Sequence, residues 1–165
     1  MTQSLNPTRG ERSDELTALL LPLQGGLQLL IPNITMAELA PGDTPTDEGS
    51  TGLDWLAGQI LWRGHGIPVV RWEGLTGHPI EADSEDHRFA VMNRLYDDLD
   101  SPFYALLIQG IPRMLRISPE SLSAATDSAD DQLPGTLFTV DTEMGQAHIP
   151  DIAWLEQQLA SMLRQ

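Results

Sequence analysis

The stretch Trp55-Leu-Ala-Gly-Gln-Ile-Leu-Trp-Arg-Gly-His-Gly-Ile-Pro-Val-Val70 decides the fold expected for this chain. Two short apolar runs, Gly58 to Trp62 and Ile67 to Trp72, flank residues 63–66, which include Gly64 and Gly66. Two glycines within four residues supply the positive φ angles that a tight hairpin connection needs. Pro68 cannot donate to a strand ladder, so the second strand is expected at a sheet edge or near a bulge.

A second hairpin is expected before this stretch. Leu16 to Leu23 is an apolar run, and after the break at residues 24–26 the apolar side chains Leu27, Leu29 and Ile31 recur at period two. Such runs joined by a Gly-Gly turn predict a β-hairpin. Residues 41–52 are rich in Gly, Pro and acids, a composition that predicts a solvated loop between two ordered pieces.

Further strands are expected downstream of the acidic linker Glu81 to Asp86. Phe89, Val91 and Leu95 are predicted on one face of a strand, and residues 103–108 form a continuous apolar run of the length of a buried strand. Two residues link this run to another at 111–117, and residues 136–140 form one more short β run. The strand-rich halves on either side of the linker would suit a pseudo-duplicated pair of barrels.

The chain ends in a different pattern, which predicts an amphipathic helix. Apolar residues recur there at spacings of three and four, and Pro150 with Asp151 stands at the start, where both are favoured. The apolar positions are Ile152, Leu155, Leu159, Met162 and Leu163. Many short strands with one clear helix make a mainly β architecture of small barrels or a sandwich. Composition alone does not choose between these two.

Length, charge and cysteine content limit the number of domains and the classes of partner. At 165 residues the chain can hold one domain, or two small β subdomains that share an interface. It has no cysteine, which excludes disulfides and thiolate metal sites, and its formal net charge of −15 disfavours nucleic acid as a partner. Residues 1–14 lack the apolar run of a secretory signal, and no run reaches the ~20 residues of a membrane span. The expected location is the cytoplasm.

The sequence carries no signature of catalysis or of a cofactor. The four histidines are not spaced as in local zinc motifs, and neither a nucleophile elbow nor a Gly-rich phosphate loop is present. Asp97, Asp98 and Asp100 do not complete a calcium loop, and a solvated turn is the preferred interpretation. No enzyme, no cofactor and no metal are therefore expected. A hydrolase that uses these acids with His87 is kept as an alternative.

An interface is suggested by the tryptophans Trp55, Trp62 and Trp72, which lie close in sequence to Arg63 and Arg71. Trp and Arg are enriched at binding hot spots, but tryptophans also fill small barrel cores, and both interpretations stay open. An exposed aromatic groove around Trp62 and Trp72 would instead indicate a stand-alone SH3-like peptide-binding module.

Three arginines are further candidates for an interface. Arg63 stands at the mouth of the Gly-bounded turn, where its guanidinium would be exposed and could grip carboxylates of an acidic partner. Arg113 and Arg116 are more simply interpreted as solvated strand charges.

The quoted stretch resembles the central segment of CheW-like domains, in which a Gly-x-x-x-x-Arg-Gly hairpin turns into an apolar strand containing Pro. Other stretches follow the order of that family. Leu19 to Leu39 is similar to its opening hairpin, Phe89 to Leu122 to its long second-subdomain hairpin, and Leu133 to Leu159 to its last strands and helix. The resemblance covers roughly residues 16 to 163.

The resemblance implies two SH3-like five-stranded β-barrel subdomains with a C-terminal amphipathic helix. It places one domain at residues 16–163, with subdomain 1 at about 27–86, subdomain 2 at about 87–148 and the terminal segments packing across, after a disordered lead-in at 1–15. The implied function is non-catalytic coupling of the cytoplasmic tip of a methyl-accepting chemoreceptor to the regulatory domain of a CheA-type histidine kinase. The protein would be cytoplasmic and recruited to membrane-associated receptor arrays.

The resemblance also implies site residues. Arg63 and Gly64 match the family's Arg-Gly and, with Trp62, are the expected receptor interface. The expected kinase interface holds Arg71, Trp72 and Arg113. Three features depart from the family pattern and lean toward a divergent branch, similar to the ChpC branch of type IV pilus chemosensory systems. These are Leu61 for the usual Asn, Arg71 for an acid, and the short turn Gly25-Gly26.

Overall fold

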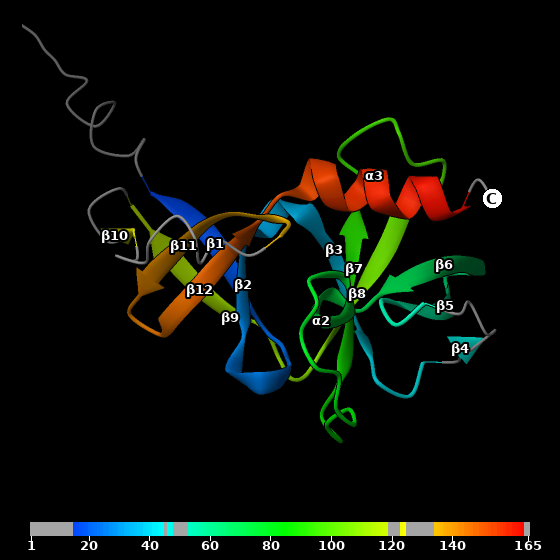
Figure 1. Ribbon diagram of the computed structural model, residues 1–165, viewed down its shortest axis with the longest axis horizontal. Helices are drawn as coiled ribbons and strands as arrows, with labels where there is room; N and C mark the ends of the chain where they lie inside the picture. Colours follow the sequence, from blue (N-terminus) through cyan, green and yellow to red (C-terminus); the bar gives the residue numbers. More distant parts are fainter. Residues whose placement is uncertain (1–14, 45, 48–52, 119–122, 125–133, 164–165) are drawn as a thin grey trace, which may run out of the picture.

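The computed structural model describes residues 15–44, 46–47, 53–118, 123–124 and 134–163 (Figure 1). Its described strands form two sheets. The first sheet has the order β10-β11-β12-β2-β1-β9, and the second has the order β3-β7-β8-β6-β5-β4. The strands of the first sheet are β1 (Leu16–Pro22), β2 (Gln28–Pro32), β9 (Arg113–Ile117), β10 (Ser123–Ala124), β11 (Thr136–Thr142) and β12 (Gly145–Pro150).

The second sheet is built from β3 (Met36–Pro41), β4 (Thr46–Asp47), β5 (Leu56–Trp62), β6 (His65–Val70), β7 (Arg88–Asn93) and β8 (Phe103–Ile108). Four helical elements complete the described part of the chain: η1 (Gln24–Gly26), η2 (Asn33–Thr35), α2 (Trp72–Leu75) and α3 (Ile152–Leu163). The prediction of a mainly β fold with a C-terminal helix is confirmed. Each sheet holds five strands of five or more residues and one strand of two residues, among the residues described.

The two halves of the chain exchange hairpins. Strands β1–β6 and β7–β12 follow the same plan, but hairpin β1–β2 lies in the sheet of the second half and hairpin β7–β8 in the sheet of the first. Short parallel joints seat the exchanged hairpins: His148 of β12 pairs with Leu29 of β2, and Val69 of β6 pairs with Ala105 of β8.

The sheets therefore divide the chain differently from the predicted subdomains. Strand β2 falls within the predicted first subdomain, at about 27–86, yet lies in the same sheet as β9–β12. Strands β7 and β8 fall within the predicted second subdomain, at about 87–148, yet lie with β3–β6. The physical reason is that alternation at period two marks a strand and its buried face but does not name its neighbour. The predicted lead-in at 1–15 lies almost wholly outside the described residues.

The largest core cluster is shared by both sheets and the C-terminal helix. Leu29 of the first sheet, Leu106 of the second and Leu155 of α3 are each at most 1% exposed and belong to this one cluster. Two smaller clusters lie within the individual sheets. Because the shared cluster contains side chains from both exchanged hairpins, burial of its apolar surface stabilises the two sheets together.

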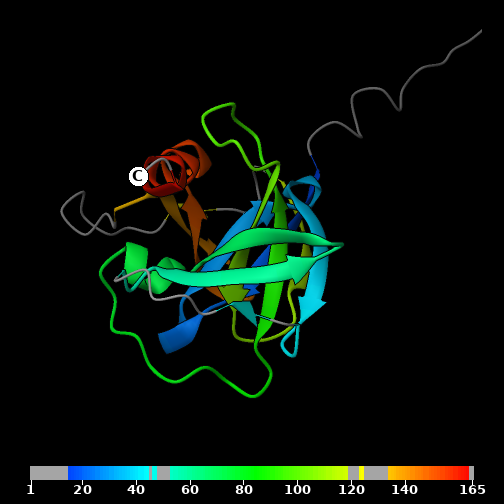
Figure 2. The ribbon, with the colours of Figure 1, turned by 90° about the vertical axis from the view of Figure 1, so that its right-hand side faces the viewer.

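Helix α3 is fixed by its N-terminus and by a buried acid. The Asp151 carboxylate accepts the Trp154 backbone N–H at 3.1 Å, which caps the first turn. The buried Glu156 carboxylate accepts the backbone N–H groups of Leu95 and Tyr96 and, at 3.2 Å, the hydroxyl of Tyr104. These bonds hold the β7–β8 loop against α3. The loop lies beside the helix in both ribbon views (Figures 1 and 2). No described helix is long and apolar enough to cross a membrane.

The shared core predicts that the two sheets open together. Leu29→Ala removes a fully buried side chain of the first sheet, which should cost about 2–5 kcal/mol of unfolding free energy. Native-state hydrogen exchange should then show the amides of β7 and β8 losing protection by the same factor as those of β1 and β2. Leu61→Ala, at a side chain 56% exposed, is the control and should change stability by no more than about 0.5 kcal/mol. Faster exchange confined to the first sheet would contradict the shared core.

Candidate functional site

The β5–β6 hairpin closes through a two-residue turn. Trp62 pairs with His65, and between them Arg63 and Gly64 have φ angles of 49° and 80°. Positive φ at both central residues is the requirement of a type I′ turn, whose twist matches that of the flanking strands. The predicted hairpin is confirmed, but the second positive φ belongs to Arg63 and not to Gly66. Gly66 lies in β6, where a Cβ would stand 2.8 Å from Oε1 of Gln59.

Pro68 lies beside an irregular part of β5, as predicted. The pairing of β5 with β6 shifts register between Leu56 and Gln59, and Pro68 is opposite Gln59. The parallel pairing of β6 with β8 begins only at Val69. The absent N–H of Pro68 therefore falls where the ladder is already interrupted, and β6 is an inner strand of the second sheet rather than an edge strand.

Arg63 takes part in a cluster that sequence reasoning had missed. Its Nη2 lies 3.4 Å from Oε2 of Glu38 on β3, and its Cζ lies 4.7 Å from the centre of the Trp62 ring. The indole Nε1 of Trp62 donates to the same Glu38 oxygen. We call these three residues the Glu38–Trp62–Arg63 cluster. No local signal in the sequence joins Glu38 to a hairpin more than twenty residues away.

Trp62 and Arg63 lie in different environments within this cluster. Trp62 is 7% exposed and packs edge-on against Phe103, so most of its ring is core. The Arg63 side chain is 68% exposed, although one face of its guanidinium covers the indole. The arginine is thus held in place by a stacking contact and an ion pair, while its outer edge can still bind a carboxylate.

The predicted kinase-interface residues do not form one surface. Trp72 is 1% exposed in the shared core, so its side chain cannot touch a partner, and the core interpretation is correct for it. Arg71 is largely buried beside the second sheet, whereas Arg113 is exposed on β9 of the first sheet. The third tryptophan of the group, Trp55, is half-buried against the core.

Arg71 makes a two-pronged ion pair with Asp83. Its Nη1 and Nη2 donate to the two carboxylate oxygens of Asp83 at 2.7 and 3.1 Å. These bonds raise the pKa of Arg71 and lower the pKa of Asp83, while partial burial acts in the opposite sense on both groups. Asp83 lies in the acidic linker Glu81 to Asp86, whose composition gives no sign of this partner.

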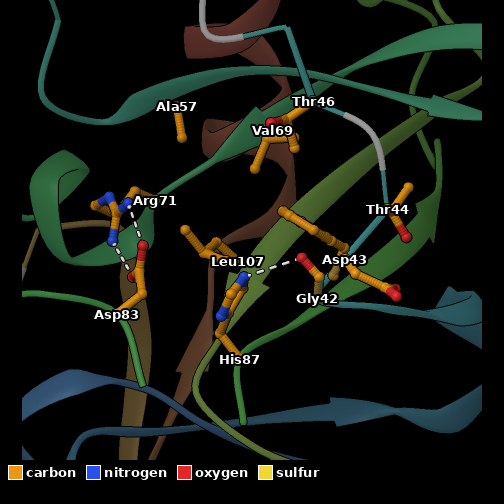
Figure 3. A pocket seen from close by; sticks show the side chains of 11 residues that line it. Gly42, Asp43, Thr44, Thr46, Ala57, Val69, Arg71, Asp83, His87 and Leu107 are labelled. Atoms are coloured by element: carbon orange, nitrogen blue, oxygen red, sulfur yellow. Dashed lines mark hydrogen bonds and ion pairs between the residues drawn. The ribbon is translucent and has the colours of Figure 1, made fainter. Parts of the chain in front are cut away.

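A cavity of about 390 Å³ opens beside this pair. Its apolar part is supplied by Ala57, Val69, Phe89 and Leu107, and residues 42–44 with Thr46 form another wall. Figure 3 shows Arg71 and Asp83 facing each other on one side of the cavity and His87 near Gly42 on the other.

His87 ties two loops together at the rim of this cavity. Its Nδ1 lies 2.8 Å from the carbonyl oxygen of Ser84, and its Nε2 lies 3.1 Å from the carbonyl oxygen of Gly42. A neutral imidazole has one N–H and can donate to one of these oxygens, whereas the imidazolium donates to both.

A polar network continues from the cavity to the first sheet. The side-chain amide of Gln24, in the β1–β2 turn, donates to Asp83 at 3.3 Å, and the Gln24 backbone N–H donates to Oε2 of Glu73 at 3.0 Å. Glu73 is fully buried, and its Oε1 has no hydrogen-bond partner among the described residues. These polar contacts join the exchanged β1–β2 hairpin to the second sheet, in addition to the apolar contacts of the shared core.

The acids of the hydrolase alternative lie elsewhere. Asp97, Asp98 and Asp100 do not line the cavity that His87 lines. Within the described ranges, no three His, Asp or Glu side chains are grouped so that they could hold a metal ion.

Comparison with known proteins identifies the fold. Residues 18–154 match the model of the CheW-like domain family. A solved structure, the scaffolding protein TtCheW from Thermoanaerobacter tengcongensis, superposes with a TM-score of 0.65 at 14% sequence identity, over 82% of this chain and 88% of that one. No curated protein sequence matches the chain significantly. The expected CheW-like fold is confirmed.

The Arg71–Asp83 pair predicts a pH-dependent contribution to stability. Because the pKa of Asp83 is lowered from 3.8, its contribution is complete above that value and is lost as the pH falls through the lower folded-state pKa. Asp83→Asn should therefore cost about 1 kcal/mol or less in urea unfolding at pH 6, and less than that at pH 3. Asp86→Asn, at an exposed position of the same loop, is the control. An equal cost of Asp83→Asn at both pH values would contradict the ionic role of this pair.

Proposed function

The chain belongs to the CheW-like domain family, and from this premise we propose that it is a non-catalytic adaptor of bacterial chemosensory signalling. It would couple the cytoplasmic tip of a methyl-accepting chemoreceptor to the regulatory domain of a CheA-type histidine kinase. The single observation that carries the proposal is the family match over residues 18–154. A rigid pair of sheets around one shared core is a scaffold suited to holding two partners at a fixed distance.

We place the receptor contact at the tip of the β5–β6 hairpin. Arg63 presents a guanidinium edge that is pre-oriented by Trp62 and Glu38, so little side-chain entropy remains to be lost on binding. A carboxylate on a receptor helix is the chemical group that this edge would bind best. Gly64 adopts a positive φ next to that of Arg63 and so keeps the turn short.

The kinase contact is proposed at a different face. Arg71 is only 14% exposed at its side chain and is already paired, so it contributes mainly by holding Asp83 and the neighbouring loop. Arg113 is exposed and remains available for direct contact. Trp72 is removed from the proposed interface because it is buried.

The alternatives receive less support from the geometry. An SH3-like peptide groove around Trp62 and Trp72 would need exposed rings, and these side chains are 7% and 1% exposed. A hydrolase built on Asp97, Asp98 and Asp100 with His87 would need these groups in one pocket, and they do not share the cavity described above.

A finer assignment is also proposed. The departures at Leu61, Arg71 and the Gly25-Gly26 turn favour a divergent branch such as the ChpC coupling proteins of type IV pilus chemosensory systems, which act in twitching motility. The proposed location is the cytoplasmic face of receptor arrays. Binding to a pilus-pathway kinase in preference to a flagellar one from the same organism would test this branch.

The adaptor role is tested by reconstitution. The purified chain should form complexes at micromolar concentration with a CheA-type regulatory domain and, separately, with a receptor tip from the same organism. Addition of both partners should give a ternary complex in analytical ultracentrifugation. Failure to bind any kinase or receptor of that organism would overturn the proposal.

Substitution of Arg63 tests the receptor contact. Arg63→Gln changes an exposed charge, so stability should change by no more than about 0.5 kcal/mol, while receptor affinity should fall roughly tenfold. Glu38→Gln removes the ion pair but keeps the arginine, and should largely retain receptor binding. Arg88→Gln, in β7, is a matched charge control. Receptor affinity that is unchanged in Arg63→Gln would remove this residue from the interface.

A further inference from the structure

Strand β9 stands last in the order of the described strands of the first sheet. It pairs with β1 on one side, through Leu115 opposite Ala18. An edge strand presents a row of backbone N–H and C=O groups that can pair with another strand. Met114 is 67% exposed and Ile111, just before the strand, is 64% exposed.

The arginines of β9 are uncommitted. Arg113 and Arg116 are both exposed, and neither side chain forms a hydrogen bond or an ion pair in the described part of the chain. By contrast, Arg63 and Arg71 pair with acids, and Arg88 and Arg94 donate to backbone carbonyl oxygens. Two free cations on one short strand are notable in a chain with 24 acids and a net charge of −15.

The corresponding edge of the second sheet is occupied differently. Strand β3 holds there the place that β9 holds in the first sheet, as the neighbour of the outer strand of an exchanged hairpin. Its acid, Glu38, is engaged by the tip of the β5–β6 hairpin, and Pro41 ends the strand without an N–H. Among the described residues, no side chain engages β9 in this way.

The alternation of side chains along β9 determines which sequence of an added strand would match this edge. Met114 and Arg116 lie on one face of β9, next to Leu19 and Thr17 of β1, while Arg113 points to the other face. Leu19 belongs to the shared core, so Met114 extends an apolar face outward from it. An antiparallel strand with the sequence pattern acid-x-apolar-acid would place its two acids opposite Arg116 and Arg113 and its apolar residue opposite Met114.

We propose that β9 is a docking edge for an extended acidic segment of a partner protein, which adds as a further strand to the first sheet. Main-chain hydrogen bonds supply the affinity in this mode, and the side-chain pairs supply the specificity. The acids of the partner would pair with Arg113 and Arg116, and its apolar residue would cover Met114. The receptor contact at Arg63 lies on the other sheet, whereas Arg113 is shared with the proposed kinase contact. The test below uses a peptide and no kinase, so the two proposals can fail separately.

A second copy of this chain is the less suitable occupant. If two β9 strands paired antiparallel about a two-fold axis at Leu115, Arg116 of each copy would stand opposite Met114 of the other, and Arg113 opposite Ile117. This pairing brings four arginines together on two adjacent strands and sets no acid opposite any of them. The arginines thus favour an acidic strand over a second copy of β9.

The test uses the full chain and a synthetic probe, the capped peptide Thr-Glu-Thr-Val-Glu-Thr-Thr, followed by backbone amide NMR. The expected result is saturable binding with the largest shift changes at residues 111–117, weakening as salt is raised. The double variant Arg113→Glu, Arg116→Glu should bind the peptide at least tenfold more weakly. It should instead bind Thr-Arg-Thr-Val-Arg-Thr-Thr, in which the acids are replaced. Arg88→Glu is the matched control and should bind the acidic peptide like the unmodified chain.

A backbone-methylated version of the acidic peptide separates strand addition from simple charge attraction. Methylation of alternate amides removes the donors and should abolish binding. Equal binding of the methylated peptide, shift changes that lie away from β9, or unchanged binding by the double variant would each overturn the proposal. So would an absence of binding at millimolar peptide. Protection of the outward-facing β9 amides from hydrogen exchange in the absence of peptide would also overturn the proposal. Protection that rises with protein concentration would show that a second copy covers the edge, and protection independent of concentration would show that residues of the same chain cover it.

Discussion

Neither half of the chain contains the strands that complete its own sheet, because hairpin β1–β2 belongs to the sheet of the second half and hairpin β7–β8 to that of the first. The parallel joints are short, with one residue pair at Leu29 and two pairs at residues 69–70. So few main-chain bonds contribute little by themselves. Burial of the shared apolar cluster must therefore hold the exchange in place, and every other feature of the molecule depends on that cluster.

The exchange has a direct consequence for the faces that a partner can reach. The Glu38–Trp62–Arg63 cluster lies at one margin of the second sheet, and β9 lies at the edge of the first. Because both sheets are built on one core, these two surfaces are fixed relative to each other. The proposed coupling role needs that fixed geometry and no bond-making step, and the Gln24 network that joins the β1–β2 turn to Glu73 and Asp83 reinforces it.

Local features of this fold follow from the sequence, and pairings distant in sequence do not. The β5–β6 hairpin, the buried strand at 103–108 and the C-terminal helix were predicted because glycine placement and apolar periodicity act within a few residues. The prediction did not include the positive φ of Arg63. The hairpin exchange, the partner of Asp83 and the burial of Trp72 were not predicted either. Each depends on which distant segment packs nearby, and an acidic linker or a Trp near an Arg has the same composition whether it is solvated or paired.

The two halves of the chain share one plan, but the equivalent edge strands β3 and β9 differ in the partners of their charged side chains. Strands β3 and β9 hold equivalent places, yet the acid of β3 is paired with the β5–β6 hairpin, whereas the two arginine side chains of β9 have no partner among the residues that the structure describes. A chain with 24 acidic and 9 basic residues cannot give each acid a cation of its own, so an arginine side chain without an acid beside it is a scarce group. Repulsion between the acidic surface of the protein and an acidic partner would be smallest where those arginines lie. Charge distribution and strand order thus favour the same edge for an acidic strand.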